Sequence, residues 1–352
     1  MRVGILTGGG DAPGLNAVIR AAVRRGVTVY DYDFVGLRMG WQGLIEADAV
    51  PLGLPEVEEI LGRGGTILGS SRTNPFGDNA EVEVPQCEKS FKQLELDALI
   101  AVGGDDTLGV ARQFSDRGLP MVGVPKTIDN DLSATDYTFG FWTAVERVME
   151  SVDNLRTTAR SHERIFVVEA MGRHAGWIAA YGGMAGAADY IFTPEQSFKV
   201  DDLVWSLKRR WESGLHYAVV VVAEGAVWEG REVYQEDMPR DEFGHVYLGG
   251  IGLELSKALA KELAPQFGRK TNDLTRHVVL GHLQRGGSPC AYDRILGTRY
   301  GAAAVDLIAT KRFGYMTALQ GRSIVPVEIN DAVSETKMVE QDFLDMARNF
   351  YY

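Results

Sequence analysis

The chain has 352 residues, 45% of them hydrophobic and 24% charged, which suits one large or two medium α/β domains with a sizeable core. A net charge of −12 without a long basic run argues against nucleic acid or an anionic membrane as the main partner. Cys87 and Cys290 are too few for a disulfide framework, so a reducing cytoplasm is expected. The first residues run straight into a glycine turn, and no long uncharged apolar run follows, so neither a signal peptide nor a membrane span is expected.

Short apolar runs alternate along the chain with segments whose hydrophobic residues recur at helical spacing. This pattern predicts strands at 3–7, 98–102, 121–124, 165–169 and 217–223, and helices at 15–25, 108–114, 143–158, 175–181, 201–212 and 253–263. Strands rich in Val and Ile on both faces indicate mainly parallel sheets with helices on both sides, an α/β fold. A break between two such units is expected near 139–142, and the polar stretch 229–273 is assigned to the second unit without a role.

Three polar loops follow predicted strands, at the sheet edge where α/β proteins bind their ligands. The first, Gly8-Gly9-Gly10, lets backbone N–H groups approach phosphate oxygens, although a tight turn without a ligand explains it equally well. The second, GGDDT at 103–107, places Asp105 beside Asp106. Adjacent carboxylates among glycines indicate a cation, and Mg²⁺ held together with donor phosphates is the usual one. The loops are expected to line one cleft.

The third polar loop, TIDND at 127–131, holds two carboxylates, a hydroxyl and an amide within five residues. That composition is typical of an Asx-rich turn. Alternatively, one carboxylate accepts the proton of an attacking hydroxyl, as the catalytic Asp of kinases does. Beside the other two loops, the second interpretation is favoured.

Two later segments, MGRHAG at 171–176 and GHLQRGG at 281–287, combine glycines with arginine and histidine. Arginine binds phosphate through its planar guanidinium, and glycines allow the backbone to come close. A buried structural role, the commoner one for a lone histidine, is the alternative for His174 and His282. Arg164 and Arg276 come just before strands in this interpretation, and taken alone each is better explained as a surface charge.

Seven ordered segments span nearly the whole chain: TGGGDAPGLNAVIR (7–20), GGTILGSSR (64–72), GGDDT (103–107), PKTIDND (125–131), RIFVVEAMGRHAG (164–176), AEG (223–225) and GHLQRGGSPCAYDRILGTRYG (281–301). Together they resemble the signatures of the phosphofructokinase family.

The resemblance implies phosphoryl transfer to the 1-hydroxyl of fructose 6-phosphate. Asp129 would be the base, with Thr127 and Asp131 beside it, and Asp105 would hold Mg²⁺. Arg173 and Thr127 would stabilise the phosphoryl group in flight. The other implied residues are Gly10 and Arg72 at the donor phosphates, and Ile128, Met171, Gly172, Glu224, His282, Leu283, Gln284 and Arg285 around the sugar phosphate, with Arg164 and Arg276 supplied by a neighbouring subunit.

The family divides by phosphoryl donor, and Asp106 and Lys126 lie where that division is made. Members that use ATP and are similar to this chain carry Gly at the first position and commonly Gly at the second, whereas pyrophosphate-dependent members carry Asp and Lys. An Asp side chain occupies the space of the ATP α-phosphate and repels it, at a cost of about 2 kcal/mol or more. Lys126 supplies a cation for pyrophosphate. The alternatives are a helix N-cap for Asp106 and a solvated loop charge for Lys126.

We therefore expect two Rossmann-like, three-layer α/β/α domains with mainly parallel sheets and the active site in the cleft between them. The expected domains are a larger donor domain of 1–140 with 284–334 and a smaller sugar phosphate domain of 141–283 with 335–352. Pyrophosphate-dependent phosphorylation of fructose 6-phosphate by a homodimer or homotetramer is the favoured function. The alternatives are an ATP-dependent phosphofructokinase and a sugar phosphate sensor that does not catalyse.

Overall fold

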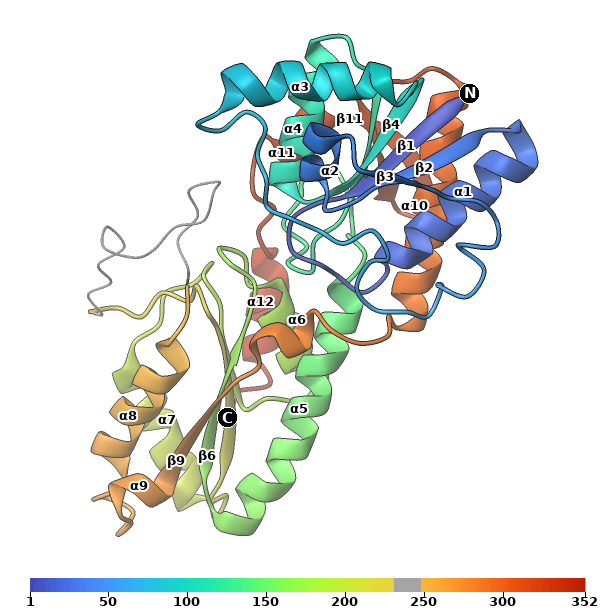
Figure 1. Cartoon of the computed structure of the whole chain (residues 1–352). Coiled ribbons are helices and arrows are strands. Elements are labelled where there is room, and N and C mark those ends of the chain that lie inside the picture. Colours follow the sequence, from blue (N-terminus) through green and yellow to red (C-terminus); the bar gives the residue numbers. More distant parts are fainter. Residues whose placement is uncertain (231–247, 352) are drawn as a thin grey trace.

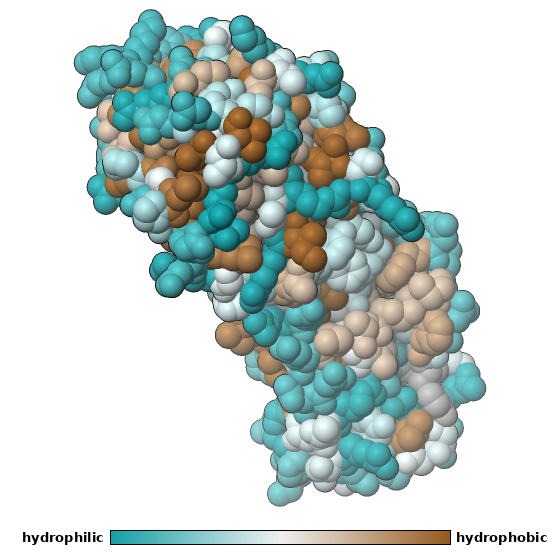
Figure 2. Space-filling view, turned by 90° about the vertical axis from the view of Figure 1, so that its right-hand side faces the viewer, coloured by the Kyte–Doolittle hydropathy of each residue, from teal (hydrophilic) through white to brown (hydrophobic). Residues whose placement is uncertain are grey.

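The computed structural model describes residues 1–230 and 248–351. The described chain forms two lobes, each built on its own β-sheet, with the N-terminus in one lobe and the C-terminus in the other (Figure 1). In a view turned by 90° the two lobes form one elongated molecule (Figure 2). No helix in the described part of the chain is long and apolar enough to cross a membrane.

The larger sheet has seven strands in the order β11-β10-β5-β4-β1-β2-β3, and its central strands run parallel. The edge strands β3 and β11 pair antiparallel with β2 and β10. The strands are β1 (Arg2–Thr7), β2 (Asp33–Leu37), β3 (Ala49–Pro51), β4 (Ala98–Gly103), β5 (Met121–Pro125), β10 (Tyr315–Gln320) and β11 (Ser323–Glu328).

Helices cover both faces of this sheet because its strands carry apolar side chains on both sides. One core lies under α1 and α10, and a second core lies under α2, α3, α4 and α11. These helices are α1 (Leu15–Tyr30), α2 (Trp41–Glu46), α3 (Ala80–Gln93), α4 (Asp105–Asp116), α10 (Ala291–Ala309) and α11 (Ile329–Val333).

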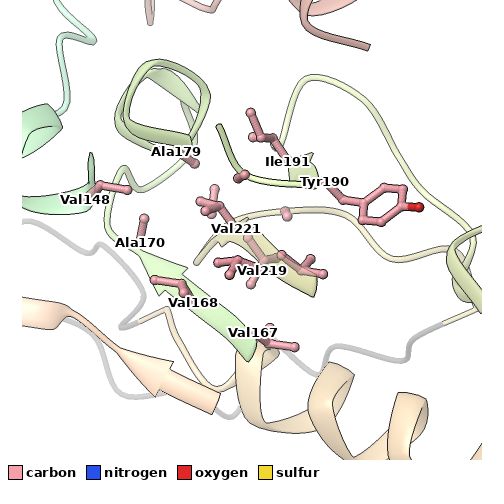
Figure 3. Packing of buried hydrophobic residues seen from close by; sticks show 14 of the residues in the cluster. Val148, Val167, Val168, Ala170, Ala179, Tyr190, Ile191, Val219 and Val221 are labelled. Atoms are coloured by element: carbon pink, nitrogen blue, oxygen red, sulfur yellow. The ribbon is translucent and has the colours of Figure 1, made fainter. Parts of the chain in front are cut away.

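The smaller sheet is fully parallel, in the order β7-β8-β6-β9, with α5 and α6 on one face and α7 and α8 on the other (Figure 1). Valines of β6 and β8 pack against Val148 of α5 and Ala179 of α6 (Figure 3). The elements are α5 (Phe141–His162), β6 (Ile165–Ala170), α6 (Trp177–Ala185), β7 (Tyr190–Phe192), α7 (Val200–Glu212), β8 (Ala218–Ala223), α8 (Ile251–Leu263), α9 (Thr271–Leu274), β9 (Thr275–Val279), the 3₁₀ helix η2 (Gly281–Gln284) and α12 (Gln341–Arg348).

The predicted strands and helices are all present, with their ends shifted by a few residues. The sequence did not predict the strands β2, β3, β7, β10 and β11 or the helices α2, α3, α9, α10, α11 and α12. Arg276 was expected before a strand, but it lies inside β9, whose short, alternately exposed sequence gave no apolar run to recognise. Of the stretch 229–273, the part at 231–247 lies outside the described residues, and α8 packs against the second sheet as expected. The predicted domain boundaries follow the division between the two sheets and stay predictions.

Helices α1 and α10 pack closely because α10 presents Gly297 and Gly301 to its neighbour. A Cβ at Gly301 would lie 2.3 Å from the carbonyl oxygen of Val18. We expect Gly301→Ala to destabilise the protein by about 1–3 kcal/mol, because α1 must move away. Chemical denaturation would measure this loss.

Gly109→Ala is the matched control, because Gly109 lies inside α4 and its added Cβ meets nothing within 4 Å. This variant should gain about 0.4–1 kcal/mol through lower entropy of the unfolded chain. Equal effects of the two substitutions would contradict the close packing of α1 and α10.

Candidate active site

One pocket collects loops from both sheets at the carboxyl ends of their strands. Loops after β1, β4 and β5 contribute from the large sheet, and the loop after β6 contributes from the small sheet. Parallel strands end at the same edge, so their following loops meet there. The lining residues are Gly9, Gly10, Arg72, Gly104, Asp105, Asp106, Thr107, Lys126, Thr127, Asp129, Asp131, Arg173 and Arg285.

All the residues that the sequence singled out for the donor, the metal and the chemistry line this pocket: Gly10, Arg72, Asp105, Asp106, Lys126, Thr127, Asp129, Asp131 and Arg173. Arg285, which was predicted for the sugar phosphate, also lines it. Gly9, Gly104 and Thr107 also line it and were not singled out, although they belong to the two glycine loops. Thr107 fills the space that Gly8 and Gly103 leave, since a Cβ at either glycine would lie within 2.6 Å of its side chain.

The loop after β1 is held by a buried lysine and lies against an arginine. The Lys126 ammonium donates to the Gly10 carbonyl over 2.6 Å, and the side chain of Arg285 lies where a Cβ at Gly10 would come within 2.8 Å. Burial, together with the charge of Arg285, lowers the pKa of Lys126 to about 8. Lys126 is only 3% exposed, so the interpretation of a solvated loop charge is wrong.

Asp105 and Asp106 form the first turn of α4, where negative charge is favoured by the helix dipole. The N-cap is Gly104, and no side chain caps this helix, so Asp106 is not the N-cap. Asp105 is half exposed, with a carboxylate oxygen 4.0 Å from the Arg173 guanidinium. Both carboxylates therefore line the pocket at the start of a helix.

Asp129 lies between the pocket and the core in a turn that is held by several hydrogen bonds. Its backbone N–H donates to the Thr127 hydroxyl, and Thr138 bonds both the Thr127 carbonyl and the Asn130 side chain. Asp129 is 4% exposed, and its Oδ1 has no hydrogen-bond partner among the described residues. Burial and the neighbouring charges of Asp129 and Asp105 raise the pKa of Asp131 to about 7. A buried acceptor without a partner is suited to receive a proton from a ligand.

Glu224 holds the loop that carries Arg173 by hydrogen bonds to its backbone. Its Oε1 accepts hydrogen bonds from the backbone N–H groups of Gly172 (3.3 Å) and Arg173 (3.0 Å). Arg173 has a positive φ of 52°, and a Cβ at Gly225 would lie 2.0 Å from the Arg173 carbonyl oxygen. The glycine after Glu224 is therefore required for this close approach.

Several predicted sugar phosphate residues lie outside the pocket in the single chain. Ile128 is fully buried in the core, so only its backbone can meet a ligand. Gln284 is also fully buried and accepts from the Met171 N–H over 3.3 Å. His282 and Leu283 line a neighbouring surface hollow, where the Leu283 side chain is largely exposed.

Arg164 and Arg276 lie at the amino ends of β6 and β9, the sheet edge opposite the pocket. Both bond backbone carbonyls nearby, Arg164 that of Asp273 and Arg276 those of Asn272 and Thr275. Within one chain the structure does not bring them to the other predicted residues. A contribution from a neighbouring subunit stays a prediction.

The pocket suits a divalent cation that is bound partly by the donor. Among residues 1–230 and 248–351, no three His, Cys, Asp or Glu side chains are grouped so as to hold a metal by themselves. Mg²⁺ commonly uses one or two carboxylates, substrate phosphates and water. Asp105, half exposed in a pocket with three further carboxylates, fits that kind of site.

Glu224 provides a test of this environment, because burial raises its pKa from 4.5 to about 7. A raised pKa means that the folded state holds the proton more tightly, so this contribution to stability is complete below pH 4.5 and is lost as pH rises through 7. The free energy of unfolding of the wild-type protein should therefore fall by about 1–3 kcal/mol between pH 5 and 8 on account of Glu224. We expect Glu224→Gln, which keeps a hydrogen-bond acceptor but does not titrate, to lack this decrease. Urea unfolding across this range measures it. Parallel pH profiles for both proteins would contradict the buried carboxyl.

Comparison with known proteins agrees with this arrangement. The phosphofructokinase family model matches residues 2–308. The pyrophosphate–fructose 6-phosphate 1-phosphotransferase of Amycolatopsis methanolica is 53% identical over 351 residues, covering 100% of both chains. The ATP-dependent 6-phosphofructokinase 3 of Streptomyces coelicolor is 47% identical, covering 96% of each.

A solved structure agrees at the level of the fold. The pyrophosphate-dependent phosphofructokinase of Marinobacter aquaeolei superposes with a TM-score of 0.80 and 22% identity, covering 99% of this chain and 91% of that one. The family model and the two relatives match nearly the whole length of this chain, including all the loops that form the pocket. The chain therefore belongs to the phosphofructokinase family.

Proposed function

We propose that this protein transfers a phosphoryl group from pyrophosphate to the 1-hydroxyl of fructose 6-phosphate, giving fructose 1,6-bisphosphate and phosphate. The observation that carries the proposal is Asp129, a buried carboxylate with an unpartnered oxygen in a pocket rich in cationic side chains. Because this carboxylate oxygen lies in a pocket, the hydroxyl of a bound ligand can reach it and give up its proton to it. Relatives named for this activity match the whole chain at about 50% identity.

In the proposed reaction Asp129 takes the proton of the 1-hydroxyl while the hydroxyl oxygen forms a bond to one phosphorus of pyrophosphate. The bond from that phosphorus to the bridging oxygen breaks, and phosphate leaves with the electron pair. Arg173 and Thr127 lie in the same pocket and donate to the phosphoryl oxygens as charge develops on them. Since an inorganic phosphate leaves, the transfer is expected to run in both directions.

Mg²⁺ is the proposed cofactor: Asp105 would hold it together with the donor phosphates, and it would neutralise charge on the donor. Arg72, Lys126 and Arg285 supply further positive charge in the pocket. Lys126 uses one of its three ammonium donors on Gly10, and since no other described residue accepts from it, two donors can bind a phosphate.

Asp106 determines the donor in this proposal. Its carboxylate lines the pocket beside Gly104 and Thr107. In a partly dehydrated site, this negative charge would repel the α-phosphate of ATP at a cost of about 2 kcal/mol or more. Pyrophosphate ends before that point, whereas ATP continues through its α-phosphate to a nucleoside. ATP-dependent phosphorylation is the second candidate, because a relative with that name is 47% identical over nearly the whole chain.

Homodimers or homotetramers are proposed as the working form, since Arg164 and Arg276 lie far from the pocket of their own chain. A neighbouring subunit then brings these two arginines to the sugar phosphate.

A cytoplasmic location is proposed because the thiols of Cys87 and Cys290 are free.

Changing Asp106 tests the donor. We expect Asp106→Gly to raise kcat/KM with ATP by about tenfold or more, because both the charge and the volume are removed. Asp106→Asn, which keeps the volume, should raise it less. Steady-state rates with each donor measure both variants, and unchanged ATP use in both would refute exclusion by Asp106.

Changing Asp129 tests the chemistry. Asp129→Asn keeps the shape of the side chain but cannot accept the proton, so kcat should fall by about 10²–10⁴-fold with either donor. Asp116→Asn, at the exposed end of α4, is the control and should keep the wild-type rate. Tight binding of fructose 6-phosphate without turnover in the wild-type protein would instead support a sensor.

A further inference from the structure

Residues 334–340, here called the strap, join α11 of the large lobe to α12 of the small lobe. The strap lies alongside the end of the loop that carries Asp129. Thr336 forms an isolated antiparallel bridge with Leu132, and the Lys337 N–H donates to the Asp131 carbonyl over 2.8 Å. The backbone of the strap is therefore bonded to the end of the TIDND loop.

The Lys337 ammonium strengthens this attachment to the large lobe. It donates to the carbonyl oxygens of Thr135 (2.9 Å) and Asp136 (2.7 Å), which follow the TIDND loop by a few residues. Asp136 is in turn bonded to the β10–β11 hairpin through Leu319 and Gly321. One side chain thus connects the strap to the sheet that holds the TIDND loop.

The same residue is also attached to the small lobe. The Lys337 carbonyl accepts from Trp177 Nε1 over 2.8 Å, and its ammonium lies 4.8 Å from the centre of the Trp177 ring. Trp177 begins α6, four positions after Arg173. Glu195 adds a second link, since its Oε1 accepts from the N–H groups of Gly176 (2.8 Å) and Val339 (3.1 Å).

Asp129 and Arg173 come from loops of different sheets, yet both line one pocket. Catalysis requires them to be held at a fixed separation, because displacement by about 1 Å can cost a hundredfold in rate. We propose that Lys337 is a positioning residue that sets the Asp129 loop against the Arg173 loop through its bonds to both lobes. This inference rests on the proposed function, in which those two side chains act on the same phosphoryl group.

A contribution to the stability of the folded protein does not by itself explain why residue 337 is a lysine. Burial lowers the pKa of Lys337 to about 8, although Glu340, Asp136 and Asp131 favour its charge, so keeping the ammonium there costs folding free energy. A methionine has similar length and packs against Trp177 and Tyr137 without that cost. The Asp136 carbonyl lies at the solvent edge, where water can replace the lost donor.

The test compares Lys337→Met and Lys337→Arg in the full-length protein, using whichever donor the wild-type enzyme turns over. We expect Lys337→Met to lower kcat about tenfold or more, to leave KM for both substrates within about threefold, and not to lower Tm. Lys337→Arg, which keeps charged donors, should recover most of the rate. Lys199→Met, which removes an exposed ammonium paired with Glu229, is the control and should match the wild type.

Trp177→Phe removes the hydrogen bond that Trp177 Nε1 of the small lobe donates to the Lys337 carbonyl. This variant provides a second test if Lys337→Met folds poorly. It should also lower kcat more than it raises KM, and the losses in the double variant should not multiply, because both changes cut the same connection. A Lys337→Met rate within about twofold of wild type, or rate losses that follow Tm and are not recovered by arginine, would overturn the proposal. A wild-type protein without turnover would contradict the proposed function instead.

Discussion

The site depends on the crowding of charge at the junction of the two lobes. Among the described residues that line the pocket, four are carboxylates and four are cationic: Asp105, Asp106, Asp129, Asp131, Arg72, Lys126, Arg173 and Arg285. Burial disfavours the charged forms of Asp131 and Lys126, so the pKa of Asp131 rises and that of Lys126 falls. Groups held in this way favour a ligand that brings both anionic oxygens and a cation, as a metal-bound pyrophosphate does.

The fold supplies this crowding through simple geometry. Parallel strands direct their following loops to one edge of each sheet, and loops from the two sheets line the same pocket. Glycines then allow close approach, as Gly10 does for Arg285 and Gly225 does for the Arg173 loop. Hydrogen bonds of the strap and Glu195 link the TIDND loop of one lobe to the start of α6 in the other.

The sequence predicted those parts of the site that are encoded locally. Short apolar strands followed by glycine or acidic loops located Gly10, Asp105, Asp106 and Asp129, because strand, loop and helix are adjacent in the chain. Contacts over long separations had no such signal: Lys337 meets Thr135 across 202 positions, and Glu195 meets Val339 across 144. Edge strands such as β3 and β9 were also missed or misplaced, since their half-exposed residues form no apolar run. The burial of Gln284 and its hydrogen bond to the Met171 N–H became visible only from side-chain positions.

The central claim is that a carboxylate at the start of α4 leaves room for pyrophosphate and not for a nucleotide. Initial rates of the wild-type protein with fructose 6-phosphate, Mg²⁺ and each donor in turn test this most directly. The account predicts saturable turnover with pyrophosphate and little or none with ATP. Efficient turnover with ATP and negligible turnover with pyrophosphate would contradict it, while leaving the assignment of Asp129 intact.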